Sequence, residues 1–99
     1  MGKTLVWLIY DISNDRVRNR VAKACKAKGL ERVQKSAFLG KLPMHGIDEL
    51  ELQCNEMIDE TQDSVYIFPL CSDDFRKVRT VGLAFDTKYV NEEVTSVFF

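Results

Sequence analysis

Six consecutive apolar residues lie near the amino terminus, Leu5-Val6-Trp7-Leu8-Ile9-Tyr10, and Asp11 ends the run. A continuous run of this kind is typical of a central strand that is covered on both faces. Asp11 therefore stands where a buried strand enters a loop, and a carboxylate there can project into a cleft and bind a hard cation such as Mg²⁺. The alternative is that Asp11 accepts hydrogen bonds from the loop or pairs with a nearby arginine. The residue type alone does not decide between these two interpretations.

A basic amphipathic helix follows the strand. Apolar residues recur at helical spacing over 17–25, and basic residues flank this stripe. Ser13 is predicted to cap the helix, with Asp15 in the first turn, where a negative charge suits the helix dipole. Gly29 is predicted to end the helix in a left-handed conformation.

The rest of the chain predicts three more strands and a second helix. Alternating side chains indicate a strand over 32–39, and an apolar stripe among acidic residues indicates a helix over 44–60. Further strands are predicted over 65–68, ended by Pro69, and over 78–85. The order β-α-β-α-β-β predicts an α+β fold, the ferredoxin-like double split βαβ, in which two helices cover one face of an antiparallel sheet.

The second face of such a sheet needs a cover of its own. Because aromatic candidates fall on both faces, we expect a homodimer that packs sheet to sheet. We expect residues 1–85 to form the ferredoxin-like core domain. We expect residues 86–99 to form a tail that includes an extra strand over 94–99 and covers a sheet edge, either its own or that of the partner.

The cysteine count and the hydropathy bear on the cellular compartment. Three widely spaced cysteines, with no Cys-x-x-Cys, argue against a disulfide scaffold or a zinc site and favour a reducing cytoplasm. We expect Cys25, Cys54 and Cys71 to be small buried hydrophobes. The longest apolar run is far shorter than the roughly 20 residues of a membrane span, and no cleavage-site pattern follows it. These features predict a cytoplasmic protein without a membrane partner.

Charge is strongly segregated along the chain. Residues 1–41 carry ten Lys and Arg against three Asp and Glu, a net charge of +7, whereas residues 42–99 carry a net charge of −8. Such segregation indicates a surface for a polyanion on the first part of the chain. A lattice of ion pairs between a basic and an acidic helix is the alternative.

Three motifs in the first part of the chain resemble a known family. These are Tyr10-Asp11-Ile12-Ser13, Arg18-Asn19-Arg20 and the run over 29–38, Gly-Leu-Glu-Arg-Val-Gln-Lys-Ser-Ala-Phe. Together they resemble the small CRISPR-associated proteins of family two, the partners of the family-one integrase in spacer acquisition. The resemblance extends over about residues 4–85, and the segment 65–71 is similar to the third strand of the family. Asn14 stands where an acid is common in the family, which leaves Asp11 as the single carboxylate.

The resemblance implies a ferredoxin-like homodimer in which the two Asp11 side chains face each other and share Mg²⁺, or Mn²⁺. It implies either a metal-dependent endonuclease that acts on single-stranded RNA or duplex DNA, or a non-catalytic bridge between two integrase dimers on duplex DNA. Asp11 carries the metal role in this family, and the residues implicated in nuclease activity or in building the site are Tyr10, Arg18, Arg20, Arg32 and Phe38. The residues expected to face a nucleic-acid backbone are Arg16, Arg18, Arg20, Lys23, Arg32 and Lys35.

Two other functions stay open at this point. Toxin-type metal-dependent RNases have a similar fold and resemble this family. A ferredoxin-like regulatory or small-ligand module is a third possibility, although it explains neither the charge segregation nor the motifs. The only histidine, His45, lies at a predicted helix start and offers no nucleophile–base pair.

Overall fold

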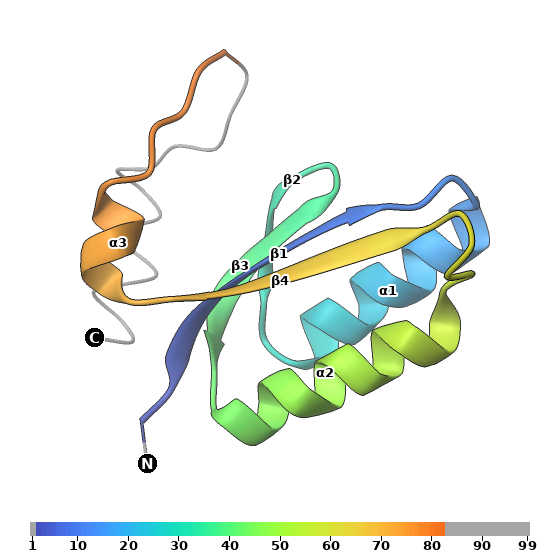
Figure 1. Cartoon of the computed structure of the whole chain (residues 1–99), viewed down its shortest axis with the longest axis horizontal. Helices are drawn as coiled ribbons and strands as arrows, with labels where there is room; N and C mark the ends of the chain where they lie inside the picture. Colours follow the sequence, from blue (N-terminus) through green and yellow to red (C-terminus); the bar gives the residue numbers. More distant parts are fainter. Residues whose placement is uncertain (1, 83–99) are drawn as a thin grey trace.

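The computed structural model describes residues 2–82, and its elements follow the order β1-α1-β2-β3-α2-β4-α3 (Figure 1). The strands are β1 (Thr4–Asp11), β2 (Glu31–Gln34), β3 (Ala37–Leu42) and β4 (Ser64–Leu70). The helices are α1 (Asp15–Ala27), α2 (Met44–Met57) and α3 (Ser72–Arg76). The predicted strand over 94–99 and the rest of the tail lie outside the described residues.

The four strands form one antiparallel sheet in the order β2-β3-β1-β4. β1 is central, as its apolar run predicts, and it pairs with β3 on one side and β4 on the other. α1 and α2 pack against each other on one face of the sheet (Figure 1). The α+β ferredoxin-like fold is therefore confirmed.

The order of the elements differs from the predicted β-α-β-α-β-β. The single strand predicted over 32–39 is a hairpin of β2 and β3, with a turn at Lys35 and Ser36 and a bulge between Arg32 and Gln34. Alternation of side chains continues through this turn, which has no Gly, Pro or Asn, so the pattern does not reveal it. The predicted strand over 78–85 was also wrong as far as it is described, because residues 78–82 form no strand and the short helix α3 precedes them.

The sheet separates two apolar clusters. Alternate residues of β1, including Val6 and Leu8, face α1 and α2 and form the larger core. On the opposite face, Leu5 and Leu39 pack against Phe75 of α3, so α3 covers part of that face. The ring of Phe75 meets Trp7 edge-on, with 6.4 Å between the ring centroids.

Both ends of α1 are fixed by local hydrogen bonds. Asn14, not Ser13 as predicted, is the amino-terminal cap, because its side chain accepts a 3.0 Å bond from the backbone N–H of Val17. Gly29 ends the helix as predicted, with φ of 91°. The backbone N–H groups of Gly29 and Leu30 donate to carbonyls of the last helical turn at 2.9 and 3.1 Å, the arrangement of a Schellman motif.

One glycine, Gly40, and one proline, Pro69, occupy special positions in the sheet. A Cβ at Gly40 would lie 2.7 Å from Cδ2 and 3.1 Å from Cα of Leu30, so β3 passes close beneath the chain that leaves α1. Pro69 was predicted to end its strand, but it lies inside β4. Because β4 is at the edge of the described sheet, the missing N–H of a proline is tolerated there.

Candidate functional site

A pocket of 420 Å³ lies where β1 ends, beside the start of α1 and the β2–β3 hairpin. It is lined by Tyr10, Asp11, Ile12, Arg18, Asn19, Arg32, Lys35 and Ser36. Five of these residues were predicted as site residues from the sequence, and they come from three separate segments. The fold therefore brings much of the motif set to one place, which we call the β1-end pocket.

Asp11 is the acidic residue of this pocket. It is the last residue of β1 and its side chain is exposed. Among residues 2–82, its carboxylate makes no hydrogen bond or ion pair, so the loop-acceptor and arginine-pair alternatives are not realised there. Arg18, Arg32 and Lys35 line the same pocket, which gives the carboxylate a positively charged surrounding.

Arg18 holds the loop between β1 and α1. Its guanidinium donates to the backbone carbonyls of Ile12 at 3.0 Å and Ser13 at 3.1 Å. It also forms an ion pair with Asp15 one turn earlier in α1. Arg18 thus fixes the backbone that follows Asp11, and it is a positioning residue as well as a lining residue of the pocket.

A column of three side chains forms the wall beside β2. The ring of Phe38 is fully buried and stacks on Tyr10, with 6.3 Å between the ring centroids and 25° between the planes. The guanidinium of Arg32 also lies over the Phe38 ring, 5.1 Å from its centroid. The Tyr10 hydroxyl donates to the carbonyl of Lys35 at 3.3 Å. Phe38 does not line the pocket itself but packs against two lining residues, Tyr10 and Arg32, and Arg32 is exposed to solvent.

The remaining predicted basic residues lie elsewhere on the surface. Arg16, Arg20 and Lys23 are exposed on α1 and do not line the pocket. Their spacing of four and three residues places them along one side of the helix. The structure thus divides the predicted residues between the β1-end pocket and a basic stripe on α1, formed by Arg16, Arg20 and Lys23.

Comparison with known proteins agrees with the motifs. Residues 4–78 match the family model described as CRISPR associated protein Cas2. The chain belongs to the Cas2 family. A relative named CRISPR-associated endoribonuclease Cas2 1, from Archaeoglobus fulgidus, is 41% identical over 64 residues, which cover 65% of this chain and 68% of the relative.

Solved structures and a fusion protein extend this comparison. A crystal structure described as that of Cas2 has 31% sequence identity and a TM-score of 0.69, and the match covers 84% of this chain and 91% of that one. A protein from Thermoproteus tenax named as a fusion of CRISPR-associated endonuclease Cas1 and endonuclease Cas2 is 35% identical over 63 residues, or 64% of this chain and 24% of the fusion. Within residues 2–82, no helix has the length and apolar character needed to span a membrane.

The β1-end pocket offers an oxygen ligand to the divalent metal that the motifs predict. A carboxylate with no bond to its own chain is a suitable ligand for a hard cation such as Mg²⁺. Within residues 2–82, however, no group of three His, Cys, Asp or Glu side chains is close enough to bind a metal. Asp11 therefore fits the ion in its chemistry, and the described part of one copy of this Cas2-family chain places this single carboxylate in the pocket.

Sequence reasoning missed part of the pocket lining. Ile12, Asn19 and Ser36 contribute to it, and Ser36 accepts a 3.0 Å bond from the backbone N–H of Tyr10. Asn19 lies inside the Arg-Asn-Arg motif, which was the available signal. Ser36 is in the unrecognised hairpin turn, so no pattern placed it next to Tyr10.

The three cysteines lie outside this pocket. Cys25 and Cys54 are buried, as predicted, and desolvation raises the pKa of Cys25 to about 12 and that of Cys54 to about 11. Cys71 is exposed, contrary to the prediction, because it precedes α3 and its Sγ accepts a 3.4 Å bond from the backbone N–H of Asp74.

Proposed function

We propose that this chain is a nucleic-acid-binding homodimer of CRISPR adaptation that bridges dimers of the family-one integrase on duplex DNA. Family membership and the Cas1–Cas2 fusion in Thermoproteus tenax support this role. In such an assembly the chain acts in the cytoplasm, and residues 86–99 contact the partner copy. The exposed Tyr66 and Phe68, which stack with 6.3 Å between centroids on the face opposite α1 and α2, belong to the surface that pairs the two sheets.

The observation that carries the proposal is the distribution of basic side chains. Arg32 and Lys35 rim the β1-end pocket, and the basic stripe begins in the first turn of α1, directly after the loop that follows Asp11. Guanidinium and ammonium groups bind phosphate oxygens without regard to base sequence, which is the binding that a bridge on DNA requires. Duplex DNA is therefore the expected ligand of the bridge, and single-stranded RNA or duplex DNA is the expected substrate of a nuclease.

A metal-dependent endonuclease activity is the second candidate, and Asp11 is the observation that favours it. Two copies of Asp11, one from each protomer, would hold one Mg²⁺ or Mn²⁺ ion, which supplies an acidified water and charge neutralisation for phosphodiester hydrolysis. Arg32 and Lys35 would bind the phosphate, and Arg18 would keep Asp11 in position through the loop. The names of the relatives support this candidate.

The substitution Asp11→Asn separates the two candidates. The change keeps the size of the side chain and removes the charge that would hold the metal. We expect it to abolish cleavage of single-stranded RNA and duplex DNA in Mg²⁺ or Mn²⁺, and to leave spacer integration with the integrase intact. The matched control is Glu56→Gln, which removes the same charge from an exposed residue of α2 outside the pocket.

Two outcomes would count against these assignments. Loss of integration in Asp11→Asn with unchanged folding would make the carboxylate essential to the bridging role. Undiminished cleavage would remove Asp11 from the nuclease site. RNA cleavage by the purified chain, with no integration activity when the integrase is added, would favour the toxin-type RNase.

A further inference from the structure

A second hollow lies on the other side of the molecule, between α2 and β4. One part of it has a volume of 420 Å³, and an adjoining part of 280 Å³ shares Glu51, Val65 and Ile67 with the first. The lining residues, which define the α2–β4 groove, are Ile47, Asp48, Glu51, Leu52, Cys54, Asn55, Ile58, Val65, Ile67 and Pro69. They recur every three or four residues along α2 and at alternate positions of β4, so the groove is elongated and runs along both elements.

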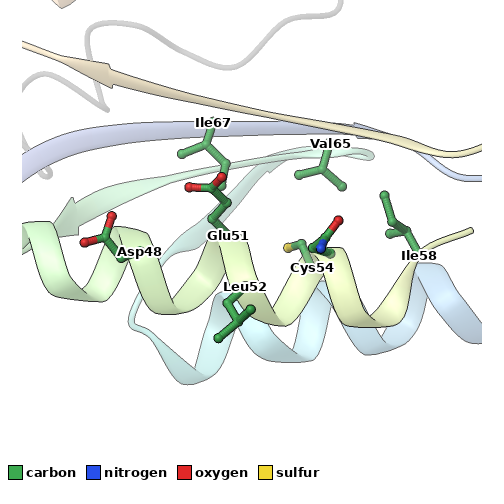
Figure 2. Close-up of a pocket in the computed structure, with 8 residues that line it drawn as sticks. Asp48, Glu51, Leu52, Cys54, Ile58, Val65 and Ile67 are labelled. Atoms are coloured by element: carbon green, nitrogen blue, oxygen red, sulfur yellow. The ribbon is translucent and has the colours of Figure 1, made fainter. Parts of the chain in front are cut away.

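The floor of the groove is apolar and only partly covered. Val65 and Ile67 project from β4 toward α2, and Ile58 rises toward them from the helix (Figure 2). All three side chains pack against the core and yet keep part of their surface exposed. Removing such surface from water is favourable, so this floor can accept an additional apolar side chain.

The rim of the groove is acidic and its charge is not neutralised within the described chain. Asp48 and Glu51 are exposed on α2, and within residues 2–82 neither makes an ion pair or a hydrogen bond. By contrast, the neighbouring Glu49 is paired at 3.2 Å with Lys28, the residue that follows the last residue of α1. No Lys or Arg occurs in α2 itself. The groove thus combines an apolar floor with two available negative charges.

These properties select among the conceivable occupants. A nucleic-acid backbone is repelled by the acidic rim. Residues 83–99 of the same chain carry Asp86, Glu92 and Glu93 against a single Lys88, so their net charge also opposes the rim. An elongated apolar groove with acidic edges matches a protein segment that presents an apolar side chain next to Lys or Arg.

We propose that the α2–β4 groove docks a segment of a partner protein, with a large aliphatic side chain on the floor of Ile58, Val65 and Ile67 and Lys or Arg opposite Asp48 and Glu51. This inference goes beyond the proposed function, which requires contact with the integrase but assigns no surface to it, and it involves neither Asp11 nor the basic stripe. It gives the chain a protein-binding side that is separate from its nucleic-acid side.

The probes for the test are short synthetic peptides with a central Leu flanked by Lys or by Glu, and a third in which Ala replaces that Leu. Binding is measured by methyl NMR of the full chain, with Leu39 on the opposite face as reference. We expect the Lys-flanked Leu peptide to shift the methyl signals of Ile58, Val65 and Ile67. The Glu-flanked and Ala peptides should bind at least about tenfold more weakly.

Charge reversal at the rim supplies the second measurement. Asp48→Lys combined with Glu51→Lys should weaken the Lys-flanked peptide about tenfold and improve the Glu-flanked one, since like charges then oppose each other. Glu56→Lys changes an exposed acid of α2 outside the groove and should alter neither affinity.

Three results would overturn the proposal. The first is equal affinity for all three peptides, and the second is binding that leaves the groove methyl signals unmoved. The third is a shift of the same methyl signals that a DNA duplex causes, or that self-association of the chain causes. Self-association would be detected by light scattering and would be lost in the Asp48→Lys, Glu51→Lys variant. Either form of the third result would assign the groove to nucleic acid or to a second copy of this chain.

Discussion

The two long helices pack side by side on the same face of the sheet but carry opposite charge. α1 has one acidic residue, Asp15, and five basic residues: Arg16, Arg18, Arg20, Lys23 and Lys26. α2 has no Lys or Arg and four acidic residues: Asp48, Glu49, Glu51 and Glu56. Each helix borders a hollow of 420 Å³. Hollows of equal size thus differ in chemistry. Arg18 of α1 with Arg32 and Lys35 of the β2–β3 hairpin makes the first mainly basic, whereas Asp48 and Glu51 of α2 make the second acidic.

The largest expected effect concerns whether the two helices open together. Cys25 of α1 and Cys54 of α2 are buried, whereas Cys71 is exposed. A soluble thiol reagent should modify Cys71 at once and the other two more than about a thousandfold more slowly, at the rate of opening. Mass spectrometry of partly modified protein checks this, and modification of Cys54 well before Cys25 would show that α2 opens independently.

The same two thiols predict a dependence of stability on pH. Burial raises the pKa of Cys25 from 9.0 to about 12 and that of Cys54 to about 11. Above pH 9 the unfolded chain therefore loses these protons first, and the free energy of unfolding falls as the pH rises toward 12. Denaturant titrations at pH 8 and above test this, and Cys25→Ala should reduce the slope.

Truncating one buried residue near the β1-end pocket and one on α2 should show that loss of stability and loss of DNA binding are separate effects. Phe38→Ala removes the buried ring beneath Arg32 and Tyr10, and Leu50→Ala removes a fully buried side chain of α2. Each should lower the free energy of unfolding by about 3–4 kcal/mol. At a temperature where both variants are folded, only Phe38→Ala should weaken the binding of duplex DNA, and Leu50→Ala should leave it unchanged. If Leu50→Ala weakened duplex binding equally, DNA binding would depend on the stability of the whole domain and not on the basic side in particular.

Neutralising the basic stripe should have a smaller effect. Arg16→Ala with Arg20→Ala should weaken duplex binding about tenfold at low salt and reduce the salt slope by about one ion per lost phosphate contact. The double substitution Asp48→Asn with Glu56→Gln, on α2, is the control and should leave the slope unchanged. An unchanged slope in the arginine variant, accompanied by lower thermal stability, would indicate an ion-pair lattice between the helices.

The smallest effect is expected for the ion pair that joins the basic helix to the acidic one. Lys28 and Glu49 form the described ion pair between α1 and α2, and Glu49 is more than half exposed. A double-mutant cycle to Ala should give a coupling free energy below about 1 kcal/mol, and less at high salt. A larger coupling would mean that the charge difference contributes to holding the helices together.

Local signals explain which parts of the fold were predictable. The apolar run of β1 and the Gly29 cap depend on near neighbours, so both were read correctly from the sequence. The β2–β3 turn at Lys35 and Ser36 has no Gly, Pro or Asn to mark it, and the alternation of side chains continues across it. Pro69 was interpreted as a strand end because its tolerance depends on β4 being at an edge, which is a property of the whole sheet.

The candidate site was predictable to a similar extent. The motifs identified Asp11 and Arg18, and the pocket contains both. The separation of Arg20 from that pocket depends on which side of α1 faces the hairpin, and helical spacing alone does not determine this. The α2–β4 groove left no sequence signal, because an apolar stripe predicts burial and does not reveal which part stays uncovered.

The strand order β2-β3-β1-β4 has a consequence for the synthesis of the chain. β1 is made first, yet one of its edges pairs with β4, the last strand of the described sheet to be made. At about 5–20 residues per second, translation from Leu42 to Leu70 takes on the order of seconds. During that time the edge of β1 that pairs with β4 has no partner from this sheet. A nascent chain stalled before Ser64 would therefore present an open, aggregation-prone strand edge until the ribosome resumes.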